Sequence, residues 1–223
     1  MQGLINVNGD NVQTLEILFL TTAIMLLPAL LVMMTSFTRY VISFSFLRSA
    51  LGTQQSPPNV VLIGLALFLT MFTMAPVMDE IQKEAYEPYV AETISQEEFL
   101  DRAQVPLKEF MVRNTKENTL QMFCDLAHMD GLPEKIDMET AAELPLRLIV
   151  PSFMTCELQR AFEIGLLLYI PFMLIDIVVS STLMAMGMIM LPPSMISMPF
   201  KLLLFVTVNG WELLFSNLIQ GFR

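Results

Sequence analysis

The sequence predicts an all-α, membrane-associated protein built from long, kinked helical hairpins with an acidic helical insertion. Of its 223 residues, 54% are apolar and only 15% are charged, whereas soluble domains average about 25% charged residues. The apolar residues gather in four long stretches. The charged residues gather between the second and the third, where residues 79–147 hold 16 of the 22 acidic and 7 of the 12 basic side chains. We therefore expect three parts, at residues 1–78, 79–147 and 148–223.

The composition also excludes several classes of function. A chain this apolar cannot hide its hydrophobic residues in one soluble core and still carry a polar coat. That excludes an ordinary cytosolic enzyme, and it excludes intrinsic disorder. The net charge is −10, which argues against nucleic acid as a partner, because that binding depends on Lys and Arg side chains that neutralise phosphates.

The N-terminal part holds two apolar stretches joined by a basic linker. Residues 17–34 are interrupted only by Pro28, and residues 60–78 carry no charge. Both are close to the length of about 20 apolar residues that crosses a bilayer as a helix. We therefore expect two apolar helices in this part.

The linker at residues 35–59 indicates an orientation in the membrane. It carries Arg39 and Arg48 and no acidic residue, so the positive-inside rule places it in the cytoplasm. The N-terminus and the acidic segment then lie outside. Residues 1–14 contain no Lys or Arg, so the basic region of a secretory signal peptide is missing. Either the first helix inserts unaided or a signal peptide has already been removed.

The acidic segment is predicted to be helical. Ser95 followed by Glu98 is typical of a capped helix start, and Pro106 is expected to open another helix. Apolar residues at loosely helical spacing follow it, namely Phe110, Met111, Leu120 and Phe123. The sequence at residues 130–133 predicts a turn.

The C-terminal part is predicted to be an apolar helical hairpin with a Met-rich loop. Residues 161–191 form a stretch that would be about 46 Å long as one straight helix, which is too long for one perpendicular span. Pro171 removes a helix hydrogen bond. We expect a kinked or broken helix that leaves regular helix near Gly187. Residues 200–219 form the fourth apolar stretch, again long enough to cross a bilayer.

Residues for catalysis are scarce. The single histidine, His128, has no cluster of histidine or cysteine around it in the sequence, and a solvated loop histidine is the simpler interpretation. Cys124 and Cys156 are 32 positions apart and could pair in an oxidising compartment, although two cysteines do not announce a disulfide framework. No phosphate-binding or nucleophile motif is present. We expect no enzyme, no metal and no cofactor.

Two charges interrupt the C-terminal apolar stretches. Asp176 and Lys201 are costly in hydrocarbon, so they should face protein or water. A structural pair between helices, a proton or substrate pathway, and a Lys201 that snorkels to the interface are all open. A turn made only of Pro192 and Pro193 would leave the two residues offset by about 12 Å. They meet within one hairpin if a wide loop starts near Gly187, and otherwise pair across neighbouring copies.

The strongest pattern is the run of residues 184–198, in which six of fifteen residues are Met. In a helix, alternate methionines would point around the axis and form no single stripe, and two prolines then stop any helix. We expect a loop with flexible apolar side chains. It is either filler that faces core or lipid, or a soft plug that closes a pore and deforms around what passes.

Three blocks of residues spread over almost the whole chain carry a family resemblance: Thr35–Tyr40 with Leu47–Thr53, Pro57–Asn59 with Gly64–Thr70 and Ala75–Val77, and Glu157–Gly165 with Asp176, Met186–Met188, Pro199–Lys201, Gly210 and Trp211. They closely resemble the FliP family of flagellar type III export-gate proteins. Where that family usually has Asp-Gly-Trp, this chain has Asn209 before Gly210 and Trp211.

The resemblance implies a pore-forming core subunit of the flagellar type III export gate. Such a subunit passes unfolded flagellar proteins across the bacterial inner membrane. FliP-like proteins assemble in five copies with FliQ and FliR into a right-handed helical cone, and FlhB joins as a further partner. In that family the gate is raised out of the membrane plane, so hydropathy does not set how many helices contact lipid. The acidic segment is expected on the periplasmic side.

The resemblance also implies site residues. Met186, Met188 and Met190 correspond to a methionine gasket that narrows the closed pore, and Asp176 and Lys201 match a charged pair of the family. An injectisome export gate shares most of the motifs and is the alternative nearest to this one. A secondary transporter with Asp176 and Lys201 at a broken helix, and a structural scaffold of the basal body, are alternatives from other classes.

Overall fold

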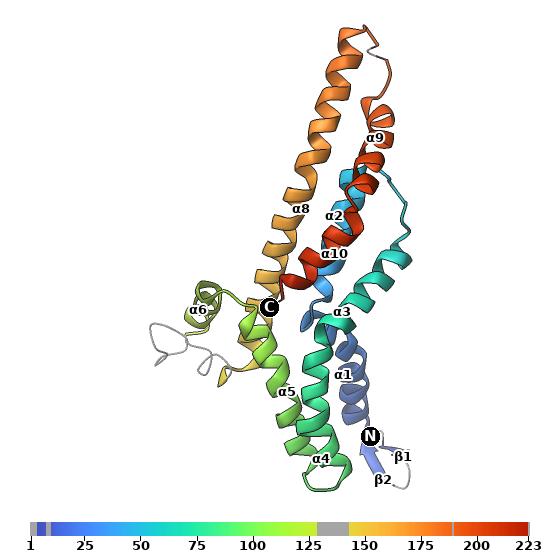
Figure 1. The fold of residues 1–223 in the computed structure, drawn as a ribbon. Helices are drawn as coiled ribbons and strands as arrows, with labels where there is room; N and C mark the ends of the chain where they lie inside the picture. The colour runs from blue at the N-terminus through green and yellow to red at the C-terminus, as the bar shows by residue number, and fades with distance from the viewer. Residues whose placement is uncertain (1–3, 8–9, 129–142, 189, 223) are drawn as a thin grey trace.

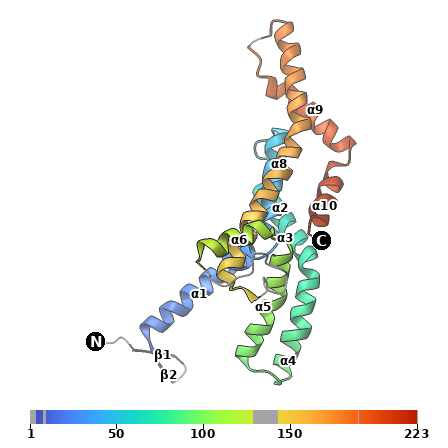
Figure 2. The same ribbon diagram turned by 90° about the vertical axis from the view of Figure 1, so that its left-hand side faces the viewer.

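The structure is a computed structural model that describes residues 4–7, 10–128, 143–188 and 190–222. It is elongated and almost entirely helical (Figures 1 and 2). The helices in chain order are α1 Thr14–Met33, α2 Phe37–Leu51, α3 Asn59–Ile81, η1 Gln82–Tyr86, α4 Glu87–Val90, α5 Gln96–Arg113, α6 Glu117–Leu126, α8 Leu146–Ala185, α9 Pro193–Thr207 and α10 Gly210–Gln220. The predicted all-α class is therefore confirmed.

One small departure from the all-α prediction lies at the N-terminus. Strands β1 (Leu4–Val7) and β2 (Asp10–Gln13) pair antiparallel, with Leu4 opposite Gln13. The sequence between them is Asn8-Gly9, the pair that most strongly favours a two-residue hairpin turn. Helix α1 follows directly, and Figure 2 shows it extending away from the other helices.

Helices α2 and α8 form the axis of the molecule, and two hydrophobic cores lie along it. The lower core packs α3, α5 and α6 against the first part of α8, around buried residues such as Met111, Ile149 and Phe153. The upper core packs α2 and α3 against α8, α9 and α10, around Tyr40, Phe44, Ala66, Phe205 and Leu218. Both cores bury large apolar side chains, each worth about 1.5–3 kcal/mol when fully buried.

Helix α2 was not anticipated, because the sequence suggested only a linker at residues 35–59. The helix ends in a glycine, Gly52, whose φ of 76° is left-handed. Glycine adopts that conformation at a helix end without a steric penalty. Its buried face carries Tyr40, Phe44 and Leu47. Much of the expected linker is therefore a core helix.

Helix α8 is a single helix of 40 residues that starts two residues before the expected boundary at 148 and continues through Pro171. Among the kinked and broken alternatives, a break is therefore excluded between Leu146 and Ala185. The helix ends at Ala185, so the chain leaves regular helix near Gly187 as predicted. Figure 1 shows α8 as one long rod, with the loop to α9 at the far end of the molecule.

The fourth apolar stretch is not one straight span. It divides into α9 and α10, which meet at an angle of 64°. Asn209 has a left-handed φ of 51°, a conformation that asparagine tolerates better than most residues. At Gly210 a Cβ atom would lie 2.3 Å from the ring of Phe205, so a glycine is required for this close approach. The bend returns the C-terminal end of the chain toward α2.

Within the described residues, two helical segments are long and apolar enough to cross a membrane. They are Asn59–Val90, which joins α3, η1 and α4, and α8. The bent α9–α10 pair gives a third if it counts as one span.

The acidic segment partly matches its prediction. Ser95 caps α5 through a capping box with Glu98, as expected. Pro106, which was expected to open a new helix, instead lies inside α5. The next helix is α6, which begins at Glu117. The predicted turn at residues 130–133 lies outside the described residues.

Candidate functional site

The Met-rich loop begins at a well-defined helix end. The backbone N–H of Gly187 donates to the carbonyl of Met184 at 3.0 Å, and the N–H of Met188 donates to the carbonyl of Leu183 at 3.0 Å. These two bonds and a Gly187 φ of 75° make a Schellman motif, which satisfies the last carbonyls of a helix. The motif sets the direction in which the chain leaves α8.

The three candidate gasket residues project from this helix end. Met186, Met188 and Met190 are 64%, 43% and 98% exposed. Large apolar side chains exposed together are unusual on a soluble monomer and mark a contact surface or a membrane surface. The three residues lie at the loop that joins α8 to α9, at one end of the molecule (Figure 1).

The structure brings Asp176 and Lys201 together within one hairpin. The Lys201 ammonium lies 2.7 Å from Asp176 Oδ2 and also donates to the carbonyl of Ala50 at 3.1 Å. The hydroxyl of Ser197 donates to Asp176 Oδ1 at 2.6 Å. The pair therefore joins α2, α8 and α9. It forms because the wide loop after Ala185 brings the two positions level, so a neighbouring copy is not needed.

The two members of this pair differ in their access to solvent. The Lys201 side chain is 8% exposed, whereas that of Asp176 is 42% exposed. The pair is thus half-buried, and its position matches the structural pair between helices that was one of the three alternatives left open by the sequence. A buried lysine needs its acceptors to offset desolvation, and here it has a carboxylate and a carbonyl.

A second ion pair, which the sequence did not suggest, lies deeper in the molecule. Arg39 Nε donates to Glu157 Oε2 at 2.7 Å, and Arg39 Nη2 donates to Glu157 Oε1. The two side chains are 2% and 0% exposed. Arg39 Nη1 also donates to the carbonyl of Gly221 at 2.9 Å, and its guanidinium lies 3.4 Å from the ring centre of Phe222. Each of the three guanidinium nitrogens thus donates a hydrogen bond.

Arg39 lies inside the protein, so of the two linker arginines only Arg48 remains as a partly exposed charge for the positive-inside rule. Arg48 donates to the side chain of Asn59. Arg39 is a single charge on an otherwise apolar helix face, and such a pattern can indicate a buried ion pair. Its partner Glu157 lies 118 positions away in the chain, so sequence spacing could not identify it.

The two cysteines do not form a disulfide. Both Cys124 and Cys156 are buried with free thiols. The Cys156 sulfur accepts a hydrogen bond from the backbone N–H of Lys116 at 3.3 Å. Burial raises the pKa of the Cys124 thiol above its usual value, and the nearby carboxylate of Asp125 adds to this. A raised pKa lowers the thiolate fraction, so Cys124 is a poor nucleophile.

His128 has a left-handed backbone just past the end of α6. Across the described residues, no group of three or more histidine, cysteine, aspartate or glutamate side chains is arranged to hold a metal ion.

The long apolar helices, the half-buried charge pair and the methionine tip together define a helical membrane-associated protein. The model of the FliP family matches residues 20–218. The chain therefore belongs to the FliP family, in agreement with the resemblance seen in its sequence.

Individual relatives, each named Flagellar biosynthetic protein FliP, agree with this membership. The chain is 46% identical over 215 residues to the protein of Aquifex aeolicus, covering 96% of this chain and 88% of the relative. It is 50% identical over 209 residues to that of Bacillus subtilis, covering 94% and 92%. It is 43% identical over 227 residues to that of Caulobacter vibrioides, covering 100% and 83%.

Proposed function

We propose that this chain is a pore-forming core subunit of the flagellar type III protein export gate. In this role it passes unfolded flagellar subunits across the inner membrane. Membership of the FliP family supports the flagellar assignment over the injectisome alternative, because the relatives named above are all flagellar proteins. The observation that carries the pore role is the exposed tip of Met186, Met188 and Met190 beyond a 40-residue helix.

The methionine tip seals the closed pore in this proposal. A Met side chain has three rotatable bonds and a polarizable sulfur, so it adapts to irregular surroundings. A ring of such side chains, one set from each copy, closes on itself and reopens around a passing chain. The apolar constriction also blocks ions, because water leaves a narrow hydrophobic channel.

Self-association and partner binding follow from the exposed apolar surface. Large apolar side chains are exposed along α3 and α8, for example Phe68, Phe72, Leu166 and Leu174. A surface of that kind calls for lipid or further protein. We place additional copies of the chain, FliQ, FliR and an FlhB-like subunit against it, as the family resemblance implies. The acidic segment lies on the periplasmic side in this arrangement.

The test replaces Met186, Met188 and Met190 by Ala, which removes most of the tip volume and leaves the backbone. Assembly should survive, and the permeability of the membrane to small solutes should rise. A triple Leu variant restores volume with less flexibility, so permeability should stay low while export slows. The matched control replaces Met25, Met33 and Met122, which are exposed on α1 and α6, by Ala and should not leak.

The readouts are small-solute permeability and swimming motility of cells that express each variant with its partner subunits. If the Ala variant assembles and is no more permeable than the parent, the seal is wrong. The three methionines are then packing residues.

A further inference from the structure

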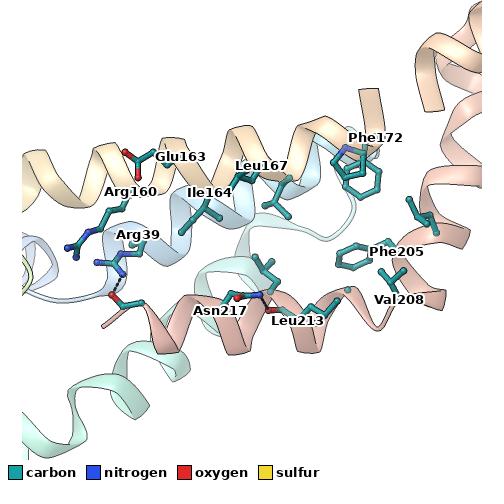
Figure 3. Close-up of a pocket in the computed structure, with 16 residues that line it drawn as sticks. Arg39, Arg160, Glu163, Ile164, Leu167, Phe172, Phe205, Val208, Leu213 and Asn217 are labelled. Atoms are coloured by element: carbon teal, nitrogen blue, oxygen red, sulfur yellow. Dashed lines mark hydrogen bonds between the residues drawn. The ribbon is translucent and has the colours of Figure 1, made fainter. Parts of the chain in front are cut away.

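A cavity of about 810 Å³ lies between α8 and the bent α9–α10 pair (Figure 3). It exists because the 64° bend carries α10 away from the line of α9 and across toward α2. Figure 3 shows Ile164 and Leu167 on the α8 side, facing Phe205, Val208 and Leu213 on the other. The two walls are apolar along most of their length.

The charged groups of this cavity gather at one end. Arg39, Arg160 and Glu163 line that end, whereas the α8 wall from Ile164 to Phe172 carries no charge. The uncharged wall from Ile164 to Phe172 spans eight residues, a length of about 12 Å along a helix. One leaflet of a bilayer with a hydrocarbon core of about 30 Å is about 15 Å deep. The apolar part of the cavity therefore holds most of the length of one acyl chain.

The charged side chains at this end of the cavity carry one more positive charge than negative charges. Arg39 and Glu157 are paired in the interior, and Lys116 lies 3.9 Å from Glu163. Arg160 Nη1 lies 3.7 Å from Oε1 of Glu157, whose carboxylate already accepts two bonds from Arg39, and it donates a long hydrogen bond of 3.5 Å to Asn114 Oδ1. The Arg160 side chain remains 28% exposed. It is the cation available to an anionic group that enters this end.

We propose that this cavity is a binding site for one anionic phospholipid, with its phosphate at Arg160 and an acyl chain between α8 and α10. The charge at one end and the apolar walls over the remaining length complement an amphipathic anion. A free phosphate would leave the apolar walls uncovered.

The first test fills the apolar part of the cavity and leaves the charges intact. Leu213 lines the cavity and is 53% exposed, so a Leu213→Trp variant should fold and occupy the space of the acyl chain. Leu203 is 62% exposed on α9 and does not line the cavity, so Leu203→Trp is the matched control. Each full-length protein is purified in mild detergent from membranes, and native mass spectrometry measures the phospholipid that remains bound.

The parent and the Leu203→Trp variant should each retain one phospholipid per chain, and Leu213→Trp should lose most of it. Equal retention by both Trp variants, or no retained phospholipid in the parent, would overturn the proposal. A Leu213→Cys variant that forms disulfide-linked dimers in membranes would also overturn it, because a second copy would then occupy the cavity.

The second test changes the charge. Arg160→Gln should reduce retention of phosphatidylglycerol and remove the preference for it over phosphatidylcholine in mixed micelles. The control is Arg102→Gln, which removes the same charge from an exposed position on α5. Its preference should match that of the parent. An unchanged preference in Arg160→Gln would contradict the assignment of the phosphate to this side chain.

Discussion

Arg39 and Glu157 lie 118 positions apart in the chain and form a fully buried ion pair between α2 and α8. The ring of Phe222 covers the guanidinium, and the same ring stacks against Phe110 of α5 at a centroid distance of 5.9 Å. The Phe222 side chain thus connects the C-terminal end of the protein to the α2–α8 pair and to the acidic segment.

Replacing Arg39 by Ala should strongly destabilise the protein. The substitution leaves the Glu157 carboxylate buried without its partner, and losing one member of such a pair costs about 3–5 kcal/mol. The measurement is thermal unfolding in detergent, followed by circular dichroism. Arg48→Ala on the same helix removes a less buried charge and should shift the midpoint far less. Similar midpoints for the two variants would show that the buried pair contributes little.

Replacing Lys201 by Ala should lower the amount of assembled complex more than it lowers export per complex. It removes the partner of Asp176 and the donor to the Ala50 carbonyl. The loss should be about 1–3 kcal/mol, less than for Arg39, because Asp176 is partly solvated. Native gels report assembly and motility reports export, with Lys83→Ala as the exposed control. Normal assembly without export would instead place Lys201 in the transport step.

Replacing Gly187 by Ala should disturb the tip without affecting the rest of the fold. Nothing lies within 4 Å of the added Cβ, so the effect comes from the left-handed backbone, which costs a non-glycine residue about 1–2 kcal/mol. We expect higher solute permeability with normal assembly, and rescue by Gly187→Asn. Gly64→Ala adds a methyl group in open space on α3 and should have no such effect. A tight membrane in Gly187→Ala would contradict this role.

The Cys124 thiol should react slowly with iodoacetamide in the folded protein. Its raised pKa means that the folded state holds the thiol proton more tightly than the unfolded state does. The associated stability is present below the usual thiol pKa of about 8.5 and is lost as pH rises above it. Mass spectrometry of protein alkylated at pH 8 should find Cys124 modified only after unfolding. Rapid modification of the folded protein would refute the prediction.

Much of the fold could be predicted from hydropathy alone. The apolar stretches at residues 17–34 and 60–78 correspond closely to α1 and α3. The end of α8 near Gly187 is also predicted, because the apolar stretch is too long for one span and two prolines follow its Met-rich end. These features depend on local sequence, and so local reasoning finds them.

The features that the sequence did not predict depend on tertiary contacts. Pro106 looked like a helix start, but it is buried inside α5. The bend at Gly210 follows from the approach of the Phe205 ring, which no local pattern reveals. Of the site residues, the sequence predicts that Asp176 and Lys201 meet in one hairpin if a wide loop starts near Gly187, and they do; the third partner, the Ala50 carbonyl, comes from a helix that was not expected. The gasket role of the methionines stays a prediction.

The Asp176–Lys201 bridge holds the α8–α9 hairpin at one point, and the tip extends beyond it like a cantilever. Ala185 ends α8 nine residues past Asp176, an overhang of about 14 Å. Among the described residues, no salt bridge or side-chain hydrogen bond joins α8 to α9 beyond this clamp. A tilt of about 5° at the clamp therefore displaces the end of α8 by about 1.2 Å over that overhang. A small change of angle at the Asp176–Lys201 bridge would therefore move the methionines sideways, and no turn of helix would have to unwind.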